Sequence, residues 1–201
     1  MTNMAILLSG RGSNMLALAQ RCAQGDLEAK ICFVASDKKD AYGIMMAKSL
    51  GLKTLLLPYE EGKEQAEKVL NEKLQSDSVD WIVLAGFMRM LSPTFVGKYE
   101  KRIVNIHPSL LPSFPGTQAI KDAFEYGVKV TGVTVHLVDE KMDHGPILSQ
   151  REVRICDEDT LESLEEKIHA IEHDLYWQTL KNLFAGRFKM KGRRMTIEGP
   201  Y

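Results

Sequence analysis

Residues 4–22 read MAILLSGRGSNMLALAQRC, and this stretch decides the fold class. A short apolar run at Met4–Leu8 ends in a glycine-rich loop, and apolar residues recur at helical spacing over Met15–Cys22. An apolar run of this length suits a strand buried on both faces, and the glycines suit a tight turn from strand to helix. The stretch therefore predicts the first strand–loop–helix unit of an α/β protein.

The same alternation continues through the first half of the chain. Strands are expected at Ile31–Ala35, Thr54–Leu57, Trp81–Ala85 and Ile103–Ile106, and helices at Ala41–Leu50 and Lys63–Leu74. Short apolar runs joined by helices predict parallel strands, and hence a doubly wound α/β sheet. Ligands of such sheets bind beyond the carboxyl ends of the strands, so the loops after the first, fourth and fifth strands should hold the site.

The second half of the chain has a different pattern. Val130–Val138 and Ile147–Ile155 alternate as strands do, and one of these late strands can run antiparallel. A long helix is expected from about Thr160 to Ala185, because leucines and isoleucines recur there every three or four residues. The basic segment that follows Gly186 is expected to be a solvated tail.

Composition excludes several classes of function. The 201 residues include 26 Lys and Arg against 27 Asp and Glu, so no bulk positive charge favours nucleic acid. The three cysteines are odd in number and widely spaced, which is typical of a protein of the reducing cytoplasm. The first residues resemble neither a signal peptide nor a membrane span. We therefore expect a cytoplasmic protein whose partners are small molecules.

The loop Gly10–Asn14 is a candidate phosphate site. Glycines let backbone N–H groups approach an anion, and the amino end of the following helix favours negative charge. A dinucleotide fingerprint would need a third glycine where this chain has Met15, and no GK[ST] follows as in a P-loop. The loop predicts a small phosphorylated ligand. The alternative is a tight turn in which Ser13 or Asn14 only caps the helix.

The segment Asn105–Pro112, NIHPSLLP, carries the strongest chemical signal. Asn105 and His107 are two residues apart, so in an extended strand both point to the same side. An amide can donate to a developing oxyanion, and an imidazole can exchange a proton near neutral pH, as acyl transfer requires. The alternative is a surface histidine beside two prolines.

Asp143 is the candidate third member of this group. It lies in MDHGP, residues 142–146, between the two late strands. A carboxylate beside His107 would fix the orientation of the ring and favour its charged form. Spacing alone leaves open whether the two residues meet, and the alternative is that Asp143 supports the turn before Gly145.

These motifs together carry a family resemblance. The segments SGRGSN, VLAGFMRMLSP, VNIHPSLLPSFPG, TGVTVHLVDEKMDHGPI and HAIEH resemble, in the same order, the glycinamide ribonucleotide branch of the folate-dependent formyltransferases. The similarity covers residues 4 to about 188. It implies transfer of a formyl group from 10-formyltetrahydrofolate to the amine of 5′-phosphoribosylglycinamide in de novo purine biosynthesis. Alternatives are a 10-formyltetrahydrofolate hydrolase and a non-catalytic phosphosugar-binding module.

The resemblance also assigns roles to individual residues. It implies that the catalytic residues are Asn105, His107 and Asp143. It implies substrate binding by Gly12, Ser13, Asn14 and Glu172, and folate binding by Lys63, Met88, Arg89, Met90, Leu91 and Asn105. Lys63 stands where the family often has Arg, His169 where some members have Gln, and Thr117–Ile120 where some have histidines. The roles of these departures stay open.

The resemblance further implies a seven-stranded, mostly parallel sheet with one antiparallel strand and helices on both faces. We expect one domain at 1–188, with a phosphosubstrate-binding half at 1–100 and a catalytic and folate-binding half at 101–188, and a basic tail at 189–201. We expect a monomer or homodimer that needs no metal and contacts no nucleic acid or membrane. A rival reading is a zinc site, since His169–His173 matches H-x-x-E-H, although little chain remains downstream to supply a third ligand.

Overall fold

The computed structural model describes residues 1–199, which divide into two compact units, Met1–Val104 and the residues from Asn105 onward. Seven strands form one sheet in the order β3-β2-β1-β4-β5-β6-β7, mostly parallel with an antiparallel β6–β7 pair. The predicted fold class is confirmed.

The first unit repeats the predicted alternation of strands and helices. In chain order its elements are β1 (Thr2–Leu8), α1 (Ser13–Gln24), β2 (Ala29–Ser36), α2 (Tyr42–Ser49), β3 (Thr54–Leu56), the 3₁₀ turn η1 (Tyr59–Glu61), α3 (Lys63–Ser76), β4 (Trp81–Leu84) and α4 (Pro93–Lys98). The pairs β1–β2, β1–β4 and β2–β3 are parallel. Residues Met4–Leu8 are fully buried, as expected of a strand covered on both faces.

Helix α4 is absent from the sequence prediction. It has only six residues, too few for an apolar stripe to stand out. Its start follows known capping rules, because Ser92 accepts a hydrogen bond from the Phe95 N–H and Pro93 occupies the first helical position.

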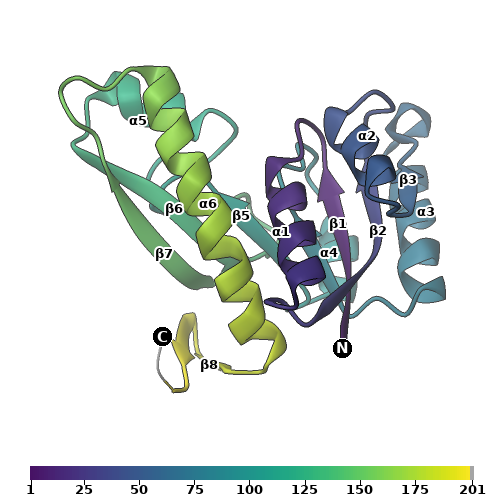
Figure 1. Ribbon diagram of the computed structural model, residues 1–201. Helices are drawn as coiled ribbons and strands as arrows, with labels where there is room; N and C mark the ends of the chain where they lie inside the picture. Colours follow the sequence, from purple (N-terminus) through teal and green to yellow (C-terminus); the bar gives the residue numbers. More distant parts are fainter. Residues whose placement is uncertain (200–201) are drawn as a thin grey trace. The chain divides into compact units, whose positions relative to one another are not determined.

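The second unit begins within β5 (Ile103–His107), which the two units share. The elements that follow are α5 (Ala119–Tyr126), β6 (Val130–Leu137), β7 (Ile147–Arg154), α6 (Leu161–Phe184), β8 (Phe188–Lys191) and β9 (Arg194–Ile197). Helix α6 lies along β6 and β7 (Figure 1), and Thr160 and Ser163 form a reciprocal capping box at its start. Helix α5 was not predicted.

The basic segment that we expected to be a solvated tail contains a β-hairpin. Strands β8 and β9 pair antiparallel, with Met190 opposite Met195, and Gly192 has a φ of 60° in the connecting turn. The sequence prediction missed these strands because frequent Lys and Arg residues obscure the alternation. The division into a domain at 1–188 and a tail at 189–201 stays a prediction.

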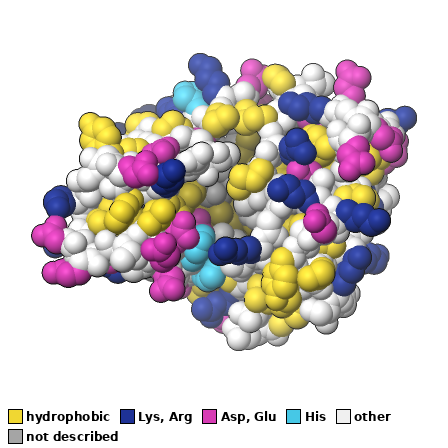
Figure 2. Space-filling view, turned by 90° about the horizontal axis from the view of Figure 1, so that it is seen from above, with side chains coloured by type: hydrophobic (Ala, Val, Ile, Leu, Met, Phe, Trp, Pro, Cys, Tyr) yellow, Lys and Arg dark blue, Asp and Glu magenta, His cyan; other side chains and the backbone are white. Residues whose placement is uncertain are grey.

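The surface carries charges of both signs. Figure 2 shows Lys and Arg side chains interspersed with Asp and Glu over the visible face, in keeping with a formal net charge of −1. Among residues 1–199, no helix has the length and apolar character needed to cross a membrane.

Candidate active site

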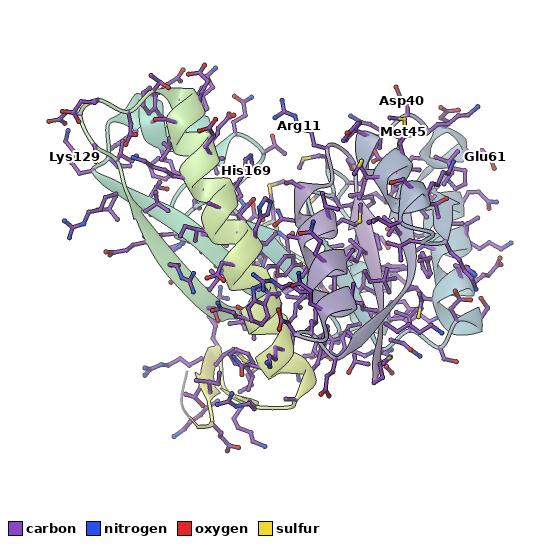
Figure 3. The ribbon with its side chains drawn as sticks, in the orientation of Figure 1. Arg11, Asp40, Met45, Glu61, Lys129 and His169 are labelled. Carbon is purple, nitrogen blue, oxygen red and sulfur yellow. The ribbon has the colours of Figure 1, made fainter. Side chains whose placement is uncertain are left out.

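The loop between β1 and α1 is shaped by a close contact with α2. Gly12 has a φ of 77°, and a Cβ added to it would lie 2.6 Å from the Cα of Gly43. The Gly43 N–H donates to the Gly10 carbonyl at 3.0 Å. Arg11 is exposed and points away from the loop (Figure 3). The chain therefore needs glycine at position 12 both for its backbone conformation and for space.

The amino end of α1 has no side-chain cap. Its N-cap is Gly12, which has no side chain to cap the helix, and the helix starts at Ser13. The first N–H groups of a helix have no partner within the helix, and in proteins such groups often bind phosphates. The alternative in which Ser13 or Asn14 only caps the helix does not fit this start, because both residues lie within the first turn. Asn14 is buried.

The segment Met88–Leu91 lies beside this loop, within the same unit. The Met88 N–H donates to Oγ of Ser9 at 2.8 Å, and the Ser9 N–H donates to the Gly86 carbonyl at 2.9 Å. Met88 and Met90 are 55% and 44% exposed, whereas Leu91 is buried. Exposed methionines on an anchored backbone suit a flat, partly apolar ligand.

Arg89 is held in place from two sides. Its Nε donates to Oδ2 of Asp37 at 2.7 Å, and its guanidinium lies 5.0 Å from the centre of the Tyr59 ring. The Asp37 side chain is only 1% exposed, and its Oδ1 has no hydrogen-bond partner among residues 1–199. Burial raises the pKa of Tyr59 to about 12, so the ring stays a neutral phenol under Arg89. Lys63, the first residue of α3, is exposed.

The structure brings His107 and Asp143 together in the second unit. His107 ends β5 and is 4% exposed. Its Nδ1 lies 3.5 Å from Oδ2 of Asp143, and its Nε2 lies 2.9 Å from the carbonyl oxygen of Phe114. Two oxygen acceptors thus face the two ring nitrogens. The reading of His107 as a surface residue beside prolines is wrong.

The Asp143 carboxylate points toward this cluster. Besides facing His107, its Oδ2 accepts a hydrogen bond of 2.8 Å from the Gly116 N–H. Asp143 has a φ of 47°, a left-handed conformation that is rare outside glycine and that clusters at functional sites. Its role is therefore not limited to the turn before Gly145.

His136, which lies in β6, also belongs to the cluster. It is 2% exposed, and its Nδ1 lies 2.9 Å from the Leu137 carbonyl, to which it donates. Burial lowers the pKa of His136 below 6.5, so the ring is neutral and Nε2 is an acceptor. Nε2 lies 3.2 Å from Nδ2 of Asn105 and 3.9 Å from Oδ1 of Asp143. The only sequence signal for the contact of His136 with Asn105 was a histidine within an apolar strand.

A buried hydrogen-bond network supports the loop that follows His107. Oγ1 of Thr134 donates to the Ser109 carbonyl at 2.7 Å and accepts from the Leu111 N–H at 3.1 Å. Nε2 of Gln150 donates to the Leu111 carbonyl at 3.0 Å. Strands β6 and β7 thereby fix the segment between His107 and the Phe114 carbonyl.

The remaining candidates of this unit lie on α5 and α6. Glu172 is 4% exposed, and its Oε2 lies 2.9 Å from Nδ1 of His169, which Figure 3 labels on α6. The rings of His169 and His173 stack with centroids 6.5 Å apart. Within residues 1–199, no three His, Cys, Asp or Glu side chains are grouped so as to hold a metal ion. Thr117–Ile120 leads into α5, with Thr117 and Gln118 exposed.

Comparison with known proteins gives consistent matches. The model of the formyl transferase family matches residues 2–180. Phosphoribosylglycinamide formyltransferase of Bacillus subtilis (strain 168) is 40% identical over 185 residues, which are 91% of this chain and 95% of that protein. The trifunctional purine biosynthetic protein adenosine-3 of Drosophila melanogaster is 40% identical over 90% of this chain and 14% of its own length. The crystal structure of glycinamide ribonucleotide transformylase 1 from Symbiobacterium toebii superimposes with a TM-score of 0.94 at 39% identity, covering 98% of this chain and 94% of that one.

Proposed function

The chain belongs to the formyl transferase family, and from this premise we propose that it transfers a formyl group to the amine of 5′-phosphoribosylglycinamide in purine biosynthesis. The observation that carries the proposal is the 3.5 Å approach of His107 Nδ1 to Asp143 Oδ2, on the same cluster as Asn105. We propose 10-formyltetrahydrofolate as the formyl donor. Support for a small folate-like ligand comes from the exposed methionines at 88 and 90 and from the fixed Arg89.

Substrate phosphate is proposed to bind the Gly12–Asn14 loop. The uncapped amino end of α1 and the close backbone at Gly12 support this assignment. We assign Glu172, which is buried except for 4% of its surface, to the glycinamide or ribose side of the substrate. Lys63 and the segment Met88–Leu91 are assigned to the folate, with Lys63 contributing charge rather than the planar fork of an arginine.

The chemical step needs groups that stabilise an oxyanion and move one proton. The substrate amine attacks the formyl carbon, and the former carbonyl oxygen becomes negative in the tetrahedral intermediate. An Asn105 N–H donates to that oxygen, and a protonated His107 stabilises its charge; one such preorganised donor contributes roughly 3 kcal/mol. The bond to the donor nitrogen then breaks. The attacking nitrogen loses one proton and the leaving nitrogen gains one, with Asp143 and His107 guiding the transfer.

The test is an assay of the purified protein with 5′-phosphoribosylglycinamide and 10-formyltetrahydrofolate. Transfer is followed by formation of the formylated product, and release of formate is measured alongside. We expect transfer that depends on both substrates, with little formate. Formate release without transfer would instead support the hydrolase. A phosphosugar-binding module would bind the ribonucleotide but leave the donor unchanged, and His107→Ala would not alter its behaviour.

The proposed activity is cytoplasmic and uses only small-molecule partners, without a metal. The three free cysteines, Cys22, Cys32 and Cys156, support a reducing compartment. The monomeric or homodimeric state stays a prediction, and sedimentation of the purified protein tests it. Metal analysis of the same sample tests the zinc alternative at His169–His173, which would require stoichiometric zinc and loss of activity with a chelator.

A further inference from the structure

The loop that carries Asp143 joins β6 to β7 and is held tightly at its base. The Leu137 N–H donates to the Pro146 carbonyl at 2.9 Å. A Cβ added to Gly145 would lie 1.7 Å from the Leu137 carbonyl oxygen, so the two arms of the loop are in direct backbone contact. Between these arms, residues 139–144 extend beyond the end of the strands.

The outer part of this loop is held by a chain of polar contacts. The Lys141 N–H donates to Oδ1 of Asp139 at 3.0 Å, and Oδ2 of Asp139 lies 2.7 Å from Nδ1 of His144. His144 is the residue directly after Asp143, so contacts that hold His144 also restrain the backbone next to Asp143.

The β8–β9 hairpin supplies the contact that completes this chain. Arg193, in the hairpin turn, donates through Nη2 to the carbonyl oxygen of His144, and its Nη1 lies 3.1 Å from Nε2 and 3.3 Å from Nδ1 of the same residue. Strand β9 lies against β7, which brings the turn to the loop. A planar guanidinium can contact a carbonyl and an imidazole ring together, whereas a lysine ammonium is a single point charge.

We propose that Arg193 is a positioning residue for Asp143, through which the hairpin braces the loop of residues 139–145. The role rests on the proposed formyl transfer, because it acts on a residue of that site. Asp143 adopts a left-handed backbone at a φ of 47°, and such strained conformations persist only where surrounding contacts hold them. The match to the formyl transferase family ends at residue 180, so Arg193 and its hairpin lie beyond the part of the chain that the family model covers.

The alternative is that Arg193 and His144 form an exposed contact that affects neither the loop nor turnover. His144 is 45% exposed and Asp139 35%, and pairs of this kind stabilise folded proteins only weakly. The two alternatives differ in the mobility of the loop and in turnover, and not in the overall stability of the protein. A brace restrains one loop and affects turnover, whereas a surface contact would leave both unchanged.

The experiment compares the wild type with Arg193→Ala, Arg193→Lys and the control Arg194→Ala, which removes the neighbouring exposed cation of β9. Hydrogen exchange of residues 138–145 is measured by mass spectrometry, and kcat and KM are measured for formyl transfer. For Arg193→Ala we expect exchange in the loop to rise and kcat to fall about fivefold, the effect of one charge-assisted contact of roughly 1 kcal/mol, with little change in KM. Arg193→Lys should recover only part of the loss, and Arg194→Ala should match the wild type.

Two outcomes would overturn the brace. One is unchanged exchange of the loop in Arg193→Ala, and the other is an equal effect of Arg194→Ala, which would show a general response to lost charge. Thermal melts of all variants confirm that the fold is retained. The exchange measurement needs no substrate, so the brace is tested even if the wild type fails to transfer formyl. A wild type without transfer would refute the proposed function by itself.

Discussion

Nδ2 of Asn105 donates to Nε2 of His136 across 3.2 Å, and this contact fixes which way the Asn105 amide faces. The Nδ1 proton of His136 is directed to the Leu137 carbonyl, so Nε2 is available only as an acceptor. One N–H of Asn105 is thereby used for orientation, and its second N–H is left for the substrate. The buried histidine makes the candidate oxyanion donor rigid.

Replacing His136 should therefore reduce turnover without touching the substrate. For His136→Leu we expect kcat to fall roughly 10- to 100-fold, because a buried N–H left without an acceptor costs about 1–3 kcal/mol. His136→Gln restores an acceptor and should recover part of the rate, with KM values close to wild type in both variants. Steady-state kinetics measures this. Equal rates for Leu and Gln would show that the acceptor has no role.

The stability of the protein should fall below neutral pH. Burial lowers the pKa of His136 below 6.5 in the folded state, and burial also lowers the pKa of His173. Below pH 6.5 these histidines bind protons in the unfolded chain but stay neutral in the folded chain, so unfolding becomes more favourable. The loss begins near pH 6.5 and grows as the pH falls through the lowered folded-state pKa values. Denaturant unfolding at pH 7.5 and 5.5 measures it, and His136→Gln should show a smaller difference.

Asp143→Asn should keep the shape of the site but remove its charge. We expect kcat to fall about 100-fold or more, the usual contribution of a group that assists proton transfer. The Gly116 N–H still finds the remaining side-chain oxygen, so stability should change little. The control is Asp157→Asn, which removes an exposed carboxylate paired with Lys129. Wild-type kcat in Asp143→Asn would exclude the assigned role.

Gly12 and Gly25 form a matched pair for the phosphate loop. Both have left-handed backbones, at φ 77° and 80°, but only Gly12 lacks room for a Cβ. Gly25→Ala should cost about 1–2 kcal/mol of stability through backbone strain alone. Gly12→Ala should cost more and should also raise the KM for the phosphorylated substrate at least tenfold. Denaturant unfolding of the two variants measures the loss of stability from backbone strain. Steady-state kinetics measures the rise in KM that displacement of the loop should cause in Gly12→Ala alone.

Asp37→Asn tests the support of Arg89. The amide loses the negative charge, so Arg89 keeps only a neutral hydrogen bond from its Nε and the contact with the Tyr59 ring. We expect the KM for the formyl donor to rise several-fold, while kcat and the KM for the ribonucleotide stay near wild type. Asp26→Asn, which removes the partially exposed partner of Arg21, is the control. A change confined to kcat would contradict this assignment.

Most of the fold was predictable because periodic patterns report burial directly. Strands β1, β2 and β4 lie where apolar runs predicted them, within two residues at either end. Helix α4 and the β8–β9 hairpin were missed for physical reasons. A helix of six residues has no stripe, and the hairpin alternates methionine with strongly polar cations, so a pattern of hydropathy scarcely marks it.

The site was predictable only in part. Spacing placed Asn105 and His107 on one side of a strand, but no rule of sequence brings Asp143, some 36 positions beyond His107, to 3.5 Å. That contact depends on the close backbone approach at Gly145 and on the left-handed turn at Asp143. His136 was missed because a histidine in an apolar strand is usually satisfied locally, and its partner Asn105 comes from another strand.

The contact between His107 and the Phe114 carbonyl affects how any mutation of His107 should be interpreted. Phe114 has a φ of 50°, unusual for a bulky residue, and its carbonyl is turned toward the imidazole. The His107 imidazole therefore holds the loop of residues 108–116 in place, in addition to its proposed chemical role. Kinetics of His107→Ala would combine the loss of a proton carrier with the relaxation of residues 108–116, so the drop in rate would overstate the ring's chemical contribution. A substitution that keeps the hydrogen bond to Phe114 would separate the two.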